Sequence, residues 1–106
     1  MKYLLLIHLD ESTQPGPDDL AQYVALADDL KAKGQWIVGV RLQPSSEAKT
    51  LRGGHVTDGP FAEAREQLGG FYLVDVPTLE EAQAIAARIP VDRRGTIEIR
   101  PLMASP

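Results

Sequence analysis

The side chains best suited to chemistry gather in residues 57–72, midway along the chain. This stretch holds three carboxylates, Asp58, Glu63 and Glu66, with Arg65 among them. Carboxylates beside an arginine can transfer protons or orient a ligand if a turn places them at the mouth of a cleft. The structural alternative is a capping aspartate followed by a solvated turn, because structural charges outnumber catalytic ones.

Asp58 is predicted to cap a short helical turn. An aspartate in a turn usually accepts the backbone N–H two residues ahead, but here that residue is Pro60, which has no N–H. The carboxylate is therefore expected to accept from the N–H of Phe61 and to begin a helical turn over residues 62–66. The Gly69-Gly70 pair is expected to end this turn and lead into the next strand.

Glu98 and Arg100 form a second charged group near the end of the chain. They lie two positions apart, so they share one face of a predicted strand. If that face is the uncovered side of the sheet, both lie in the cavity of a dimer, where a buried charge needs a partner. Arg100 is the best candidate for gripping a carboxylate or enolate oxygen. The alternative is an ion pair that holds the edge strand.

Aromatic rings and histidines supply the other candidates. Phe61, Phe71 and Tyr72 could wall a pocket for a flat organic ligand, although such rings more often belong to a core. His8 ends a predicted central strand and could act as a base, whereas a lone histidine there is more often only hydrogen-bonded. His55 is expected on a hairpin surface. Two histidines without a metal-ligand spacing predict no metal site.

The composition indicates one globular domain. The chain has 106 residues, of which 43% are hydrophobic and 25% charged. Residues 1–102 are expected to form the domain and residues 103–106 a frayed tail. The formal net charge of −4 argues against nucleic acid and acidic membranes as partners. The absence of cysteine, together with an apolar start too short for an export signal, predicts a cytoplasmic protein.

The periodicity predicts a mixed α+β fold. Alternating or continuous apolar residues predict main strands at residues 3–8, 35–42, 71–76 and 96–100. Helical spacing predicts a first helix over residues 17–33, with an inner stripe at Leu20, Tyr23, Val24, Ala27 and Leu30, and a second over residues 79–89 that begins with a capping box and ends at Pro90. Turn residues predict a hairpin with strands at 49–51 and 55–57 that projects from the main sheet.

This order of elements, βαββαβ with an inserted hairpin, is the ferredoxin-like arrangement. Its first and third main strands lie in the middle of an antiparallel sheet, and both helices cover one face. These two strands are apolar on both sides, so the face without helices needs a cover. A second copy of the chain, packed sheet to sheet as a two-fold homodimer, is the simplest cover.

Several motifs resemble those of the DGPF branch of the YCII-related family. They are TDGPFAE at 57–63, EQLGGFY at 66–72 and EIRP at 98–101, supported by LQPS at 42–45 and AKTLR at 48–52. The resemblance covers nearly the whole chain. It implies a ferredoxin-like domain that forms a dimeric α/β barrel.

For function, the resemblance implies two classes. Other members of the wider family resemble small-molecule enzymes such as dehydrochlorinases and muconolactone isomerases, with a histidine on the first helix and an aspartate before the proline that follows the second helix. Here the first helix has no histidine, and Ile89 precedes Pro90, so this dyad does not carry over. Genes similar to this one often lie beside extracytoplasmic-function sigma factors, which suggests a regulatory association.

The preferred hypothesis is a cytoplasmic homodimer with a cleft for a small organic molecule. If the protein is an enzyme, it is predicted to catalyse proton transfer without a cofactor. The catalytic candidates are Asp58, Glu66 and Arg100. The predicted ligand-binding residues are Asp58, Phe61, Glu63, Glu66, Tyr72, Glu98 and Arg100. The rival hypothesis is a non-enzymatic partner of a sigma factor, and a third is that the motif only builds the fold.

Overall fold

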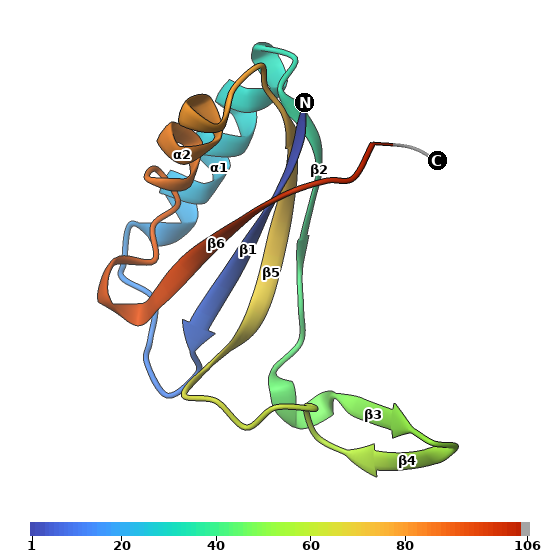
Figure 1. Cartoon of the computed structure of the whole chain (residues 1–106). Coiled ribbons are helices and arrows are strands. Elements are labelled where there is room, and N and C mark those ends of the chain that lie inside the picture. The colour runs from blue at the N-terminus through green and yellow to red at the C-terminus, as the bar shows by residue number, and fades with distance from the viewer. Residues whose placement is uncertain (105–106) are drawn as a thin grey trace.

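The computed structural model describes residues 1–104 and shows a four-stranded sheet with two helices on one face (Figure 1). The sheet strands are β1 (Lys2–Asp10), β2 (Trp36–Arg41), β5 (Glu66–Asp75) and β6 (Gly95–Pro101), and the helices are α1 (Asp19–Ala32) and α2 (Leu79–Ala86). The strand order is β2-β5-β1-β6, and every neighbouring pair is antiparallel. The predicted α+β class is therefore confirmed, and the first and third main strands lie in the middle of the sheet.

The helix ends follow local capping chemistry. At the start of α2, the Thr78 side chain accepts a hydrogen bond from the backbone N–H of Glu81 at 3.2 Å, as the predicted capping box requires. This helix ends at Ala86, three residues earlier than predicted, although Ile89 beyond it is still buried. After α1, Gly34 adopts a φ of +70°, the left-handed conformation that stops a helix at glycine.

The core lies between the helices and the sheet. Tyr3, Leu5 and Ile7 alternate along β1 and are all buried, as predicted. The predicted inner stripe of α1 is wrong in part, because Leu26 and Leu30 are its buried residues. Leu20 and Val24 are instead 67% and 52% exposed, since the helix is rotated to direct the Leu26 side toward the sheet.

The opposite side of the sheet, here called the uncovered face, is apolar in the middle. Leu4 lies opposite Leu73, and Leu6 opposite Phe71, so these four side chains lie on one side of the central strands. Val38 continues the row onto β2, where it is 38% exposed. No helix covers this face in the part of the chain that the structure describes (Figure 1).

The predicted hairpin forms a separate two-stranded sheet of β3 (Lys49–Arg52) and β4 (His55–Asp58). It extends away from the lower end of the main sheet, on the side opposite the helices (Figure 1). Gly53 and Gly54 form its turn, both with positive φ. The short 3-10 helix η1 (Ser45–Glu47) leads into it from β2.

The predicted helical turn after Asp58 is wrong. Asp58 is the last residue of β4, and its carboxylate pairs with the Lys49 ammonium group instead of capping a helix. Residues 62–65 form an irregular loop, in which the Gln67 side chain donates to the carbonyl groups of Ala62 and Ala64 at 3.1 and 3.0 Å. These bonds satisfy carbonyl groups that a helix would otherwise use.

Strand β5 begins at Glu66, five residues earlier than predicted, and passes through the Gly69-Gly70 pair. These glycines therefore do not end a turn. Gly70 is buried in the sheet, where its backbone comes very close to the carbonyl group of Val40 on β2. Glycine is needed there for close packing of two backbones and not for a bend.

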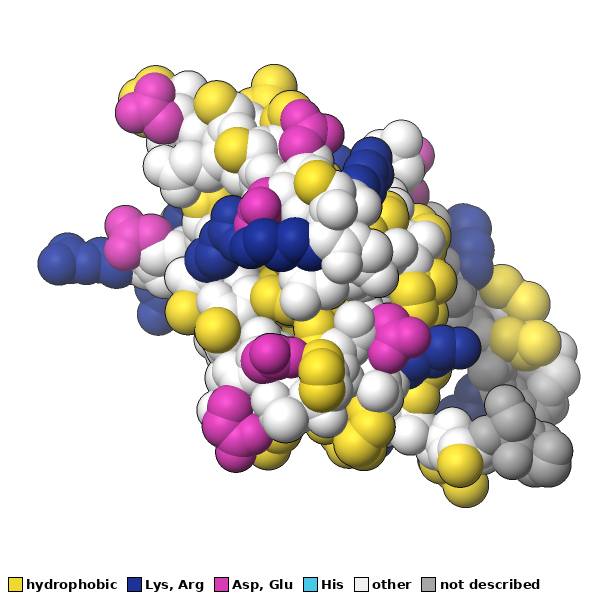
Figure 2. All heavy atoms as spheres, turned by 90° about the horizontal axis from the view of Figure 1, so that it is seen from above, with side chains coloured by type: hydrophobic (Ala, Val, Ile, Leu, Met, Phe, Trp, Pro, Cys, Tyr) yellow, Lys and Arg dark blue, Asp and Glu magenta, His cyan; other side chains and the backbone are white. Residues whose placement is uncertain are grey.

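Two surface observations complete the fold. Seen from above, acidic and basic side chains are interspersed with apolar ones (Figure 2). Within residues 1–104, no helix is both long enough and apolar enough to cross a membrane. Of the predicted frayed tail, Met103 and Ala104 are exposed and lie outside any helix or strand, whereas residues 105–106 lie outside the described residues.

Candidate functional site

A cavity of about 420 Å³ lies between the first turns of α1 and the sheet. Ile7 and Leu9 of β1 supply part of its apolar surface, and Leu20 of α1 lies at its edge, largely exposed. Gly69 and Gly70 of β5 line it without adding side-chain volume. A volume of this size is in the range of small-ligand sites in proteins.

Two phenol groups face this cavity, one from each layer. Tyr23 comes from α1 and Tyr72 from β5. Burial raises the pKa of the Tyr72 hydroxyl to about 12, and it also raises the pKa of Tyr23. Both groups are therefore protonated at neutral pH and can donate a hydrogen bond to a ligand.

The Tyr72 ring is held in place by Trp36. Their ring centroids are 4.9 Å apart at an interplanar angle of 59°, a tilted arrangement that aromatic pairs favour. Trp36 can approach because Gly39 has no side chain: a Cβ there would lie 2.4 Å from the Trp36 ring. The edge strand β2 thus supports one wall of the cavity.

Three charged residues complete the lining. Arg41 at the end of β2 and Arg94 in the 3-10 helix η2 (Asp92–Arg94) are the cations, and Asp19 in the first turn of α1 is the anion. One Asp19 carboxylate oxygen accepts the backbone N–H of Gly16 at 2.8 Å. The cavity is therefore apolar inside, with two phenols and an excess of positive charge.

A chain of hydrogen bonds positions Arg94. Its Nε donates to the Thr13 hydroxyl at 2.9 Å, and that hydroxyl donates to the backbone carbonyl of Asp10 at 2.6 Å. The Asp10 carboxylate in turn accepts from the backbone and hydroxyl of Ser12 and from Arg65 Nε at 3.2 Å. These hydrogen bonds, those of Ser12 first, lower the pKa of Asp10, so it stays ionised.

The raised pKa of Tyr72 predicts a loss of stability in alkali. The folded state holds this proton more tightly than the unfolded chain, whose tyrosines titrate near 10. The free energy of unfolding is therefore expected to be insensitive to this group below pH 10 and to fall as the pH rises toward about 12. Urea unfolding across this pH range should show a smaller fall for Tyr72→Phe than for the wild type. Equal falls would contradict the assignment.

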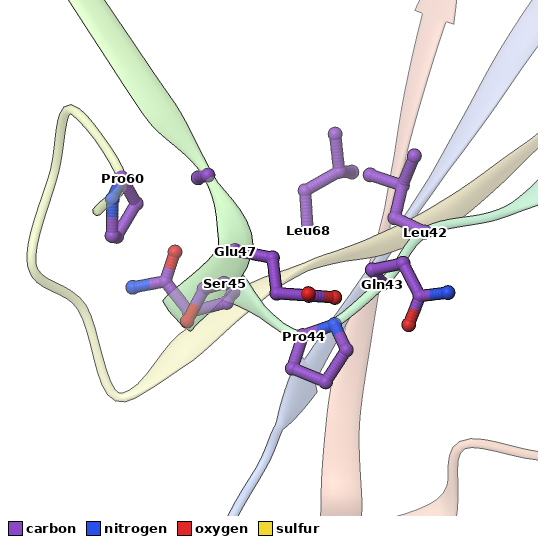
Figure 3. Close-up of a pocket in the computed structure, with 9 residues that line it drawn as sticks. Leu42, Gln43, Pro44, Ser45, Glu47, Pro60 and Leu68 are labelled. Atoms are coloured by element: carbon purple, nitrogen blue, oxygen red, sulfur yellow. The ribbon is translucent and has the colours of Figure 1, made fainter. Parts of the chain in front are cut away.

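A second hollow, of about 310 Å³, lies at the base of the hairpin (Figure 3). Leu42 and Pro44 line it from the segment after β2, Pro60 from the loop after β4, and Leu68 from β5. Glu47 is the one ionisable side chain among its described lining residues. It therefore lacks the arginines and phenols that line the cavity beside α1.

The hairpin end carries three of the predicted ligand-binding residues. Asp58 is exposed and paired with Lys49, and Glu63 is exposed in the loop that follows. Phe61 is 75% exposed, with the Arg52 guanidinium 5.8 Å from its ring centroid. None of the three lines the cavity beside α1.

The sheet separates the remaining candidates. Glu66 lies opposite Asp10 and Arg100 opposite Leu4, six residues further along β1, so they are about 20 Å apart. The structure of the chain therefore does not bring Asp58, Glu66 and Arg100 into one cavity.

Glu98 does lie beside Arg100, as predicted, and also beside His8. It pairs with His8 Nε2 at 3.1 Å and with Arg100 at 3.5 Å, which matches the ion-pair alternative. Tyr72 is the one predicted ligand-binding residue that lines the cavity beside α1.

The sequence interpretation missed Tyr23, Arg41 and Arg94 as site residues. Tyr23 is the one residue with a hydroxyl group in the predicted apolar stripe of α1, and this feature could have identified it as a site residue. Arg41 and Arg94 carry no such signal, because they come from elements far apart in the sequence. No group of three or more metal-ligating side chains occurs within residues 1–104.

Comparison with known proteins identifies relatives. A family model described as "YCII-related domain" matches residues 1–105. The uncharacterised protein R00369 of Rhizobium meliloti (strain 1021) is 46% identical over 68 residues, which are 58% of this chain and 55% of that protein. The match thus spans just over half the length of this curated relative.

A solved structure has a similar fold. It is 5-chloro-2-hydroxyhydroquinone dehydrochlorinase (TftG) from Burkholderia phenoliruptrix AC1100, in complex with 2,5-dihydroxybenzoquinone. The TM-score is 0.57 with 17% sequence identity, and the match covers 99% of this chain and 96% of that chain. At this identity the likeness shows the fold.

Proposed function

This chain belongs to the YCII-related domain family, and we propose that it binds a small organic molecule in the cavity between α1 and the sheet. The observation that carries the proposal is the pair of protonated phenols, Tyr23 and Tyr72, beside the apolar inner surface of the cavity. Such a lining suits a flat ring with oxygen substituents: the ring contacts the leucine and isoleucine side chains, and the oxygens accept from the phenols.

The similar fold of the TftG dehydrochlorinase supports this class of ligand. Its structure holds 2,5-dihydroxybenzoquinone, a small ring with several oxygens. A ring of that size would fit a cavity of about 420 Å³. This compound is therefore a suitable probe of the cavity.

If the protein is an enzyme, we propose proton transfer without a cofactor. Tyr23 and Tyr72 would stabilise negative charge that develops on a ligand oxygen, because fixed hydrogen-bond donors favour the charged form. Asp19 is the one carboxylate among the described lining residues and is the candidate base. Asp58, Glu66 and Arg100 lie outside this cavity, so they have no part in this proposed step. Their catalytic roles stay predictions.

We further propose a two-fold homodimer, the dimeric α/β barrel, formed through the uncovered face. The apolar row of Leu4, Leu6, Phe71 and Leu73 supports it, because a monomer would leave these side chains in water. Glu98 and Arg100 would then border the interface. The hairpin, whose second strand ends at Asp58, extends on this same side (Figure 1), so a second subunit would be able to contact it.

Three finer assignments remain proposals. Membership of the DGPF branch rests on the residues Asp58-Gly59-Pro60-Phe61. A cytoplasmic location rests on the absence of cysteine. The association with a sigma factor has no support from the fold or from the comparisons, and small-molecule binding is preferred.

The proposed function can be tested by closing the cavity. Leu20→Trp is expected to fill its edge and to abolish the thermal stabilisation that a bound compound gives to the wild type. The matched control is Val24→Trp, one helical turn away, because Val24 is also exposed but does not line the cavity. The measurement is a thermal-shift screen with aromatic acids, phenols and 2,5-dihydroxybenzoquinone.

Two outcomes would overturn this proposal. One is the absence of any stabilised transition in the wild type across the screen. The other is equal stabilisation of the wild type and Leu20→Trp, which would place the bound compound elsewhere.

A further inference from the structure

We propose that Arg41 and Arg94 form an anion subsite at this cavity, so that its ligands are small organic acids or ionised hydroxyquinones. The inference rests on the proposed function and narrows its ligand class. One negatively charged oxygen of the ligand would lie between the two guanidinium groups, while its ring enters between α1 and the sheet.

The first reason is that these two cations are not neutralised by the protein. Within residues 1–104, Arg65, Arg88 and Arg100 each lie within 4.0 Å of a carboxylate. Four other arginines in this range, Arg41, Arg52, Arg93 and Arg94, have no such partner, and of these Arg41 and Arg94 line the cavity. Unpaired arginines that line a cavity are suited to carboxylate or enolate oxygens, which they bind through charge and paired N–H donors.

The second reason is the charge balance at the site. Asp19 is the one described acidic residue that lines the cavity, and one of its oxygens is already bonded to the Gly16 N–H. The cavity lining therefore holds two guanidinium groups and one carboxylate that is already partly occupied. This local excess of positive charge occurs in a chain whose formal net charge is −4.

The third reason is that hydrogen bonds to Thr13 fix the position of the Arg94 side chain. Its Nε donates to the Thr13 hydroxyl at 2.9 Å, and its Nη2 is 3.4 Å from the Thr13 carbonyl. No residue of the described chain accepts from Nη1, so this group is available to a ligand. A guanidinium fixed by the protein loses less entropy when it binds an anion.

The fourth reason is that the arginines and phenols act on the same space. The positive charges of Arg94 and Arg41 both lower the pKa of Tyr23, against the larger effect of burial, and Arg41 also lowers that of Tyr72. Such effects require the groups to be near one another. A ligand oxygen within reach of Tyr23 is therefore within the field of both arginines.

The test compares charged and neutral aromatic compounds of similar size. The probes are benzoate against benzamide, and 2,5-dihydroxybenzoquinone, ionised at neutral pH, against neutral hydroquinone. Dissociation constants are measured by calorimetry for the wild type, Arg41→Gln and Arg94→Gln. The control is Arg93→Gln, because Arg93 is adjacent to Arg94 but does not line the cavity.

We expect each of the two variants to bind at least one of the anions about tenfold more weakly, as the loss of one charge-assisted hydrogen bond implies. Binding of the neutral compounds should change little, and Arg93→Gln should behave like the wild type. Added salt should weaken the binding of the anions and leave the binding of the neutral compounds unchanged. Benzoate and the quinone together distinguish a carboxylate from an ionised hydroxyl as the preferred group.

The inference is overturned if the neutral compounds bind the wild type as tightly as the anions, or if both arginine variants retain full affinity. If binding then still disappears in Leu20→Trp, the cavity remains the ligand site and only the anion subsite is wrong. If no probe binds in a manner sensitive to Leu20→Trp, the proposed function itself is wrong. Should Arg94→Gln fail to fold, the exposed Arg41 still gives the decisive comparison.

Discussion

Gly70→Ala is expected to destabilise the protein by about 3 kcal/mol, the upper end of the cost of overpacking. A Cβ at Gly70 would lie 2.4 Å from the carbonyl oxygen of Val40. That oxygen belongs to the backbone of β2, so relief requires the two strands to separate. Because Gly70 also lines the cavity, the same change should weaken ligand binding.

The adjacent glycine is the control. A Cβ at Gly69 would meet Leu9 Cδ1 at 3.0 Å, which is the end of a flexible side chain that can move. Gly69→Ala is therefore expected to change the free energy of unfolding by no more than about 1 kcal/mol, since alanine also restricts the unfolded chain. Urea unfolding of the two variants measures the difference. Equal stabilities would mean that β2 and β5 are not as close as the structure shows.

Leu6→Glu is expected to convert the proposed dimer into monomers. Leu6 lies in the apolar row of the uncovered face, opposite Phe71. A glutamate there would bury an unpaired charge in each subunit, at a cost of about 3 kcal/mol or more per subunit, and two-fold symmetry doubles the cost. Light scattering after size exclusion should give about twice 11.6 kDa for the wild type and 11.6 kDa for the variant.

A matched change on the other side of the sheet provides the control. Leu79 is 41% exposed in the first turn of α2, so Leu79→Glu should leave the mass of the dimer unchanged. A wild type that is monomeric at all concentrations would contradict the proposal. The uncovered face would then be exposed to water in solution.

The sequence predicted those elements that local patterns determine. Alternation of Tyr3, Leu5 and Ile7 identified the buried side of β1, and the Thr78 and Glu81 pair identified the start of α2. The helical turn at residues 62–66 failed because its residues favour a helix only locally. In the structure the backbone of Glu66 already belongs to β5 and lies opposite Asp10 of β1. This long-range strand pairing overrides the local helix preference.

The site was less predictable than the fold. The density of charged and aromatic residues predicted a site at residues 57–72. Of the predicted ligand-binding residues, Tyr72 alone lines the cavity beside α1. Tyr23 of α1, Arg41 of β2 and Arg94 of η2 line this cavity together although they are far apart in the sequence. Single-sequence spacing has no access to such long-range proximity.

The bond between Arg94 and Thr13 has a consequence for synthesis of the protein. These residues are 81 positions apart, and Arg65 reaches Asp10 across 55 positions. A nascent chain can form α1 early, but it cannot complete the proposed anion subsite of Arg41 and Arg94 until Arg94 has emerged from the ribosome. Tyr23, Arg41 and Tyr72 are made earlier, so the proposed anion subsite is the last part of the cavity to form during synthesis.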